Sequence, residues 1–308
     1  MSGGITTVPA GSVTANFTSS AYLPQFYASI TPNTVITNIY GSGSYSIGGG
    51  TSYPQLVAIT PDAAAVSVDG ATTIAIGGTN DTVTATGDTP VVAFLASGSV
   101  LNTGNTTATV FGATGPSTIN AGSGATTAFG STGDLVFSGG ASSGDFVLGG
   151  AGQTSINAGS GGNNTLIGGS GTSMITASGS GTGDLLVGGL GTTMVNAAST
   201  TGALTISVNP NSNSGTLVAT LGSGADTMLA GAGQAVVQGG SGPDVYGFVA
   251  GHSGGAVTIL GFSGKDNIAF EGYSAPPVEA VGSLGDVITL SDGTTITLSG
   301  IDHKIFSV

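Results

Sequence analysis

Two aspartates in glycine-rich segments are the side chains whose spacing best suits binding chemistry. Asp226 and Asp244 each follow the pattern Gly-x-Gly-x and lie eighteen positions apart. Two neighbouring carboxylates repel each other unless a cation lies between them. Ca²⁺ accepts six to eight oxygen ligands in a flexible geometry, and glycine-rich turns offer backbone carbonyls beside the carboxylates. The pattern therefore predicts a Ca²⁺ site formed by Asp226, Asp244 and the backbone of Gly222, Gly224, Gly240 and Gly242.

The alternative is that both are exposed turn aspartates that bond to their own backbone. Asp134, Asp145 and Asp184 each follow a glycine more closely, one residue out of this register, and we interpret them as structural turn caps. Asp81, in GGTNDTV, also falls one residue short and is a weaker candidate ligand.

The charge balance excludes several classes of partner. The 308 residues include 15 acidic and two basic side chains, Lys265 and Lys304, for a net charge of −13. Nucleic-acid binding and attraction to anionic lipid both depend on several basic side chains, so we expect neither partner. No apolar stretch is long enough to insert into a membrane. Cysteine is absent, which removes disulfides and thiolate metal sites.

Catalytic motifs are also missing from the sequence. It contains no His-Glu-x-x-His zinc motif and no phosphate-binding loop with its lysine. His252 and His303 lie far apart, and neither has a second histidine at metal-ligand spacing. We interpret both as ordinary surface or cap residues, and we expect that the protein is not an enzyme.

The fold follows from an internal repeat of about nine residues. Units such as GGAGQTSIN (149–157), GGSGTSMIT (168–176) and GGSGPDVYG (239–247) align without gaps. Each unit has room for one glycine turn and one short strand, and cannot bury its own apolar face. Two units would form one coil of a parallel solenoid, with coils stacked at the strand spacing of roughly 4.8 Å. The inward row would contain Ile119, Ile156, Ile175, Val195, Val237 and Tyr246. An antiparallel sandwich with glycine turns is the alternative.

Two segments resemble a known family. GGSGPDVYG (239–247) matches the nonapeptide G-G-x-G-x-D-x-U-x of the RTX, or haemolysin-type calcium-binding, proteins, and LGSGADTML (221–229) matches it with one substitution. The resemblance implies a parallel β-roll with Ca²⁺ held in its turns. Most other units lack the aspartate and carry Thr118, Thr126, Thr154, Ser173, Thr193 or Ala235 in its place.

The C-terminal region, with "AGHSGGAVTILGF", "GKDNIAF" and the final "IFSV", resembles the uncleaved C-terminal part of RTX proteins exported by type I secretion. This implies the type I secretion machinery as a partner. It also implies a secreted protein, extracellular or on the cell surface of a Gram-negative bacterium.

These observations predict three parts: an aromatic-rich segment (1–64), a solenoid (65–247) and a C-terminal cap with a secretion signal (248–308). The expected fold is all-β, a right-handed parallel β-roll or β-solenoid with an N-terminal β-rich cap and a C-terminal β-sandwich-like cap. The aromatic side chains of the first part either cap the solenoid end or mediate self-association. They are Phe17, Tyr22, Phe26, Tyr27, Tyr40, Tyr45 and Tyr53.

The leading functional hypothesis is a secreted, self-assembling structural protein stabilised by Ca²⁺, a subunit of an extracellular filament, surface layer or biofilm matrix. Its partner would be further copies of the same chain. The alternative is a non-polymerising adhesin, or a glycan- or ice-binding solenoid module. Regular outward Thr-x-Thr pairs would favour ice binding, but the sequence has only isolated pairs such as Thr84-Ala-Thr86 and Thr295-Ile-Thr297.

Overall fold

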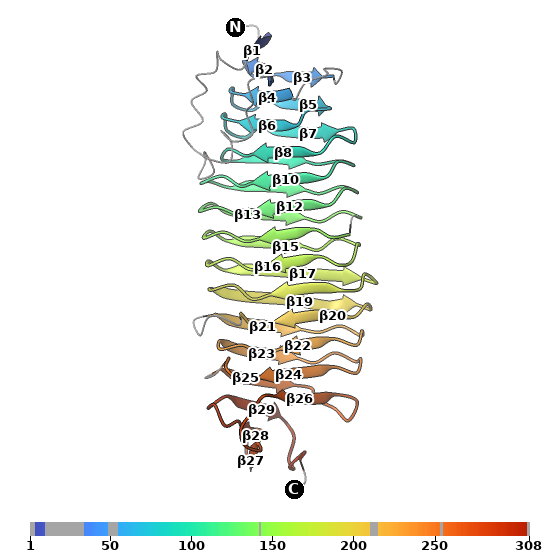
Figure 1. The fold of residues 1–308 in the computed structure, drawn as a ribbon, viewed down its shortest axis with the longest axis vertical. Coiled ribbons are helices and arrows are strands. Elements are labelled where there is room, and N and C mark those ends of the chain that lie inside the picture. The colour runs from blue at the N-terminus through green and yellow to red at the C-terminus, as the bar shows by residue number, and fades with distance from the viewer. Residues whose placement is uncertain are drawn as a thin grey trace. The chain divides into compact units, whose positions relative to one another are not determined.

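The protein is an all-β parallel solenoid in its computed structural model (Figure 1). The structure describes residues 4–9 (backbone only), 34–48, 55–141, 143–209, 215–252 and 255–306. These residues form 29 strands and no helix, so none of them belongs to a helix that could span a membrane. The chain divides into two compact units, Met1–Ile156 and Asn157–Val308. The predicted parallel solenoid is confirmed.

In the first unit, successive strands alternate between two sheets. Sheet A contains β1(Gly4–Pro9), β2(Val35–Tyr40), β4(Gln55–Ile59), β6(Thr73–Ile76), β8(Val91–Phe94), β10(Ala108–Phe111), β12(Thr126–Phe129) and β14(Phe146–Leu148). Sheet B contains β3(Ser44–Ile47), β5(Ala65–Asp69), β7(Thr82–Thr86), β9(Ser99–Asn102), β11(Ser117–Asn120), β13(Leu135–Ser138) and β15(Thr154–Asn157). β1 pairs with β2 antiparallel, and the strands that follow pair in parallel.

The second unit repeats this plan. Sheet A contains β16(Thr165–Ile167), β18(Asp184–Val187), β20(Leu204–Ser207), β22(Thr227–Leu229), β24(Val245–Val249) and β26(Asn267–Glu271). Sheet B contains β17(Ser173–Gly179), β19(Thr192–Thr200), β21(Thr216–Thr220), β23(Gln234–Gln238) and β25(Ala256–Leu260). Sheet B continues through β29(Thr295–Ser299), which is parallel to β25, to the antiparallel strands β28(Gly285–Thr289) and β27(Val278–Gly282).

The core of each unit consists of inward rows of apolar side chains, because alternate residues of a strand point to opposite faces. In the first unit Ile119 pairs with Phe137, and in the second Ile175 pairs with Val195, all of them buried. All six residues predicted to point inward are buried. Tyr246, however, lies in sheet A opposite Met228, whereas the other predicted residues lie in sheet B.

The parallel ladder starts earlier and ends later than the repeat pattern predicts. It begins at Val35, where β2 pairs with β4, and not near residue 65. It continues past residue 247 through the pairing of β24 with β26. The first coils lack the Gly-x-Gly spacing, yet their apolar strands Val35–Tyr40 and Gln55–Ile59 support the same pairing.

Glycines in the turns allow the coils to approach at the backbone hydrogen-bonding distance. A Cβ atom on Gly240 would lie 1.7 Å from the carbonyl oxygen of Gly222, and one on Gly242 would lie 1.7 Å from that of Gly224. No side chain fits such a space, so these glycines are required by the stacking and not only by turn conformation.

Replacing Gly242 by alanine is expected to destabilise the fold by about 3 kcal/mol, because the backbone of two coils must move apart to admit a methyl group. Gly264→Ala is the matched control, since a Cβ there meets nothing within 4 Å. Urea denaturation of both variants measures the difference. Equal stabilities for the two variants would contradict the close-approach argument.

Candidate functional site

Asp226 and Asp244 lie in stacked turns of the second unit, as the eighteen-residue spacing predicts. Asp226 ends the turn between β21 and β22, and Asp244 ends the next turn on the same edge, between β23 and β24. The backbone N–H of Asp226 donates to Asp244 Oδ1 at 3.2 Å. Ala235 lies in β23, after the intervening turn on the other edge.

Each of these carboxylates accepts hydrogen bonds from two backbone amides. The amides of Gly222 and Gly240, four residues before each aspartate, donate to Asp226 Oδ2 at 3.3 Å and Asp244 Oδ2 at 3.1 Å. The other oxygen accepts from the preceding coil, where Leu204 N donates to Asp226 Oδ1 at 3.1 Å. Both aspartates are 1% exposed, so they are buried and not the exposed turn residues of the alternative interpretation.

A third aspartate, missed from the sequence, continues this ladder. Asp266 Oδ1 accepts from the amide of Asp244 at 2.9 Å, and its Oδ2 accepts from the amide of Ser263 at 2.8 Å. The spacing Gly264-x-Asp266 is the same as Gly242-x-Asp244, which is the signal that could have identified it. Asp226, Asp244 and Asp266 are called the aspartate ladder below.

In turns without the aspartate, a hydroxyl accepts the hydrogen bond from the amide four residues earlier. Ser173 Oγ accepts from Gly169 N, and Thr193 Oγ1 accepts from Gly189 N, both at 3.0 Å. In the first unit this position belongs to Ser117, whose Oγ accepts from Ala113 N, and not to the predicted Thr118, which is one residue too late. A hydroxyl therefore closes its own turn, whereas the carboxylates of the ladder also bind the preceding coil.

The other acidic turn residues also accept backbone hydrogen bonds. Asp145 Oδ1 accepts from Thr126 N at 2.7 Å, and Asp184 Oδ1 accepts from Asn164 N at 2.9 Å. Asp134 accepts from Gln153 N at 2.8 Å on an exposed edge. All three thus serve as structural caps between neighbouring coils.

The oxygens expected to hold Ca²⁺ are engaged with backbone amides in this arrangement. Besides the carboxylates, the Gly222 carbonyl accepts from Ser241 N at 3.0 Å. Within the described residues, no three acidic or histidine side chains cluster closely enough to hold a metal. The predicted set of Asp226, Asp244 and their glycines therefore does not fit Ca²⁺ as arranged here, and calcium binding at these turns stays a prediction.

Burial is the largest cause of the raised pKa at four of the buried aspartates. Burial raises the pKa of Asp226 and of Asp184, against the lowering effect of their backbone hydrogen bonds. The pKa of Asp244 is raised by burial first and then by the charges of Asp226 and Asp266. Asp81, fully buried, has its pKa raised by burial to about 6; its Oδ1 accepts from Ala64 N, and its Oδ2 receives no hydrogen bond.

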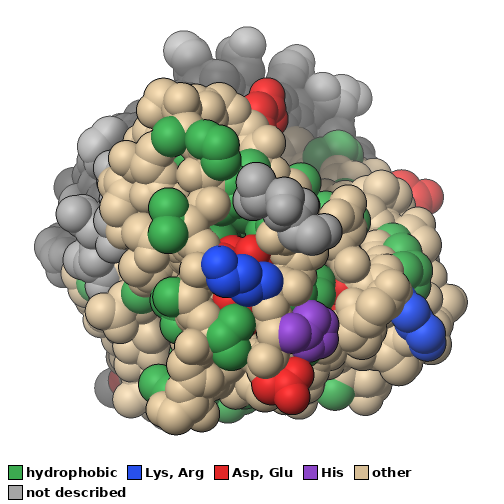
Figure 2. Space-filling view, turned by 90° about the horizontal axis from the view of Figure 1, so that it is seen from below, with side chains coloured by type: hydrophobic (Ala, Val, Ile, Leu, Met, Phe, Trp, Pro, Cys, Tyr) green, Lys and Arg blue, Asp and Glu red, His purple; other side chains and the backbone are tan. Residues whose placement is uncertain are grey.

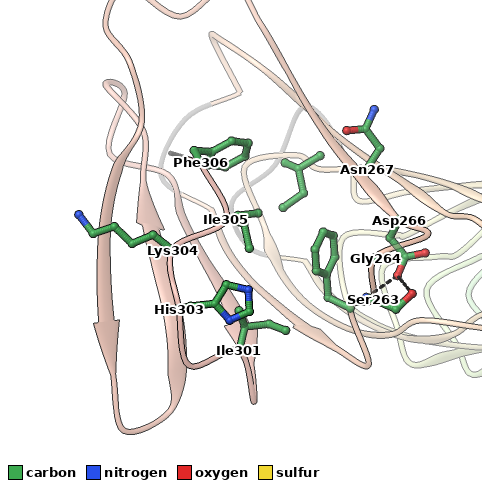
Figure 3. Close-up of a pocket in the computed structure, with 11 residues that line it drawn as sticks. Ser263, Gly264, Asp266, Asn267, Ile301, His303, Lys304, Ile305 and Phe306 are labelled. Carbon is green, nitrogen blue, oxygen red and sulfur yellow. Dashed lines mark hydrogen bonds between the residues drawn. The ribbon is translucent and has the colours of Figure 1, made fainter. Parts of the chain in front are cut away.

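A pocket of about 480 Å³ opens at the C-terminal end of the second unit, between the β25–β26 turn and the last residues (Figure 3). Its polar lining includes Ser263, Asp266 and His303. Ser263 Oγ donates to Asp266 Oδ2 at 3.0 Å, while the 71% exposed His303 pairs with Asp302. The pocket does not join these three groups into a nucleophile–base arrangement.

Only two of the aromatic residues assigned to capping or self-association are described. Tyr40 is 50% exposed, and the Tyr45 hydroxyl donates to the carbonyls of Tyr40 and Gly41, which fixes the turn between β2 and β3. Phe17, Tyr22, Phe26, Tyr27 and Tyr53 lie outside the described residues.

A row of exposed apolar side chains runs across sheet B of the second unit. The register pairs Met174 with Met194, Met194 with Val218, and Val218 with Val236. Their side chains are 46, 40, 43 and 39% exposed. We call these four residues the sheet-B row. Sequence analysis found the inward row beside it but did not identify this outward one.

No family model matches this chain, and neither the curated proteins nor the solved structures include a significant match.

Replacing Asp244 by alanine is expected to cost about 3 kcal/mol, because the amides of Asp226 and Gly240 would lose their acceptors inside the protein. Asp244→Ser should recover part of the loss, since a hydroxyl closes its own turn at Ser173. Asp134→Ala is the control, and should cost under about 1 kcal/mol because water can replace the exposed acceptor. Chemical denaturation measures all three, and equal losses for Asp244→Ala and Asp134→Ala would refute the ladder's structural role.

The buried Asp81 should make stability depend on pH. Its folded pKa of about 6 exceeds the usual value near 4, so the folded state favours the protonated form. The protonated Asp81 carboxyl makes its full contribution to the free energy of unfolding below about pH 4. That contribution is lost as pH rises through 6, which lowers the free energy of unfolding by about 2 kcal/mol after allowing for screening. The stability of Asp81→Asn relative to the native chain should therefore rise by about 2 kcal/mol between pH 4 and pH 8, because asparagine does not ionise. A stability difference that does not change with pH would contradict this assignment.

Proposed function

We propose that this protein is a self-assembling structural protein whose copies pack through the sheet-B face of the solenoid. The observation that supports this proposal is the sheet-B row, four apolar side chains exposed on consecutive coils. Contiguous exposed apolar surface on a soluble protein is typical of an interaction site. A second copy presents the same row at the same strand spacing, so each exposed side chain of one copy can pack against one of the other.

The charge distribution favours the same interpretation. The strands β17, β19, β21, β23 and β25 contain no Asp, Glu, Lys or Arg. A chain with a net charge of −13 is repelled by its own copies over most contacts, but a contact through these five strands brings no like charges together. Polar residues such as Asn196 and Thr220 lie beside the row and could bond across the interface.

The proposal also includes secretion, which rests on the resemblance to RTX proteins. In this proposal the chain is exported from a Gram-negative cell by type I machinery and becomes a subunit of a filament, surface layer or biofilm matrix. A stabilising role for Ca²⁺ also belongs to the proposal, and the aspartate ladder gains part of its stability from backbone amides without it.

The alternative of ice binding receives less support from the outward rows. In sheet A of the second unit Thr165, Thr205 and Thr227 share one row, but Leu185 interrupts it. The adjacent outward positions, such as Val187 and Leu229, are mostly apolar. Paired threonine ranks are therefore absent from these described strands.

Val218→Lys is expected to weaken assembly at least 10-fold, since an unpaired buried charge costs several kcal/mol. Thr205→Lys is the control, because it adds the same charge on an outward position of the other sheet. Negative-stain electron microscopy and sedimentation over a concentration series measure the effect.

The same concentration series, measured at millimolar Ca²⁺ and in chelator, tests separately whether Ca²⁺ stabilises the assembly. Assemblies that persist in chelator would remove calcium from the proposal while leaving self-assembly intact. A native chain that stays monomeric under both conditions would reject self-assembly and direct attention to glycan and surface binding.

A further inference from the structure

Strand β27 ends sheet B and has an open edge. It pairs antiparallel with β28, and no strand of the described residues pairs with its other side. An unpaired strand edge presents N–H and C=O groups to which another strand can add. The last described residues do not fill this place, because the amides of Ile305 and Phe306 bind the side chain of Glu279, each at 3.0 Å. Among the described residues, no backbone hydrogen bond joins these two amides to β27.

The register of the hairpin shows which residues of β27 face the open edge. Leu290 N donates to Thr294 O at 2.9 Å, so the even-numbered residues of β28, which lie in the same register, form the hydrogen-bonded pairs with β29. Because the bonded side alternates along a strand, the odd-numbered residues of β28 bond to β27. The β27 residues opposite them are Val278, Ala280 and Gly282. The backbone groups of Glu279 and Val281 therefore point to the open edge.

The same hairpin carries apolar side chains that the fold leaves uncovered. Leu284 and Val278 are 75% and 67% exposed, more than any other large apolar side chain of the described residues, and Val281 is 43% exposed. Seen from the C-terminal end, apolar side chains lie at the surface and few side chains are charged (Figure 2). An open strand edge with exposed apolar side chains is typical of a site where another strand pairs.

We propose that the partner at this edge is a second copy of the chain, with β27 pairing antiparallel to β27 about a two-fold axis at Ala280. In this register Glu279 of each copy forms a hydrogen-bonded pair with Val281 of the other. Both residues that face the edge are thereby satisfied, and Ala280 lies opposite Ala280 at the axis. A two-fold contact requires such a self-complementary surface. The strand meets this requirement because its only charged residue, Glu279, lies opposite an apolar one.

The charge and the ends of the strand select this register. A register centred on Glu279 would place this residue opposite its own copy, and like charges directly opposite each other are destabilising. A shift in the other direction would place Glu279 opposite Ser283, which lies in the turn after β27, and would lose that hydrogen-bonded pair. Pro276 and Pro277 have no N–H, so the pairing stops at Val278. The contact therefore closes as a dimer.

This contact uses a different surface from the sheet-B row and does not depend on it. The sheet-B row lies on the outward face of β17, β19, β21 and β23, whereas the proposed pairing uses the backbone edge of β27. Pairing at β27 would continue sheet B from the second unit of one copy into the second unit of the other. The two contacts can therefore be removed separately.

Disulfide cross-linking of Ala280→Cys tests the register, because the chain has no cysteine of its own. Ala280 is exposed, and at the axis the Cα atoms of the two copies would lie about 4.5 Å apart, within the range that a disulfide spans. Mild oxidation should link this variant at least about 10-fold faster than Ala275→Cys, a matched control at an exposed position outside the pairing. Equal rates for the two variants would overturn the proposed register.

Sedimentation of the Val218→Lys chain over a concentration series isolates this contact, because that substitution disrupts the sheet-B row. The chain should show a monomer–dimer equilibrium. Adding Ala280→Lys should raise the dissociation constant at least about 10-fold, since two like charges would meet at the axis, whereas adding Ala275→Lys should change it less than about 2-fold. A Val218→Lys chain that stays monomeric, or equal effects of the two added lysines, would reject a second copy as the partner of this edge.

Discussion

The backbone hydrogen-bond ladder between coils is the constraint on which the rest of each unit depends. Parallel strands must stack at about 4.8 Å, so every turn must stack at that distance as well. Where the Gly222 carbonyl would lie 1.7 Å from a Cβ on Gly240, only glycine allows this approach. The same constraint places equivalent residues directly above one another, so one unsuitable side chain meets its neighbours in two coils. A chain built in this way gains from small turn residues and from few charges.

The aspartate ladder shows how the fold accommodates the charges that it keeps. A strand that begins at a turn leaves amides without partners, and the carboxylates of Asp226, Asp244 and Asp266 accept from them in both their own turn and the preceding coil. Burial works against ionisation, as the raised pKa values of Asp226 and Asp244 indicate. The hydroxyl of Ser173 or Thr193 avoids that penalty but serves one coil only. An aspartate at this position therefore has a desolvation cost but adds a hydrogen bond between coils, whereas a serine has neither.

The nine-residue repeat was sufficient to predict the parallel solenoid, the inward rows and the stacking of Asp226 on Asp244. It could not predict the start at Val35, because the first coils are held by apolar strands without a glycine signature. It also could not reveal that Glu279 and Asp286 lie on one face, since this depends on the antiparallel register of β27 and β28, which the repeat does not encode. The carboxylate spacing suggested a calcium site, but the sequence could not show that backbone amides already occupy those oxygens.

The sheet-B row needs an explanation outside the fold itself. Alternation along a strand requires Ile175 to be apolar because it points into the core, but it places no such demand on Met174. Thr258 occupies the same row after Val236, so the ladder accepts a polar residue there without difficulty. Scattered exposed apolar residues are ordinary on protein surfaces, whereas four on consecutive coils form a continuous strip. Since neither the core nor the ladder requires that strip, it is the feature on which the proposed contact between copies depends.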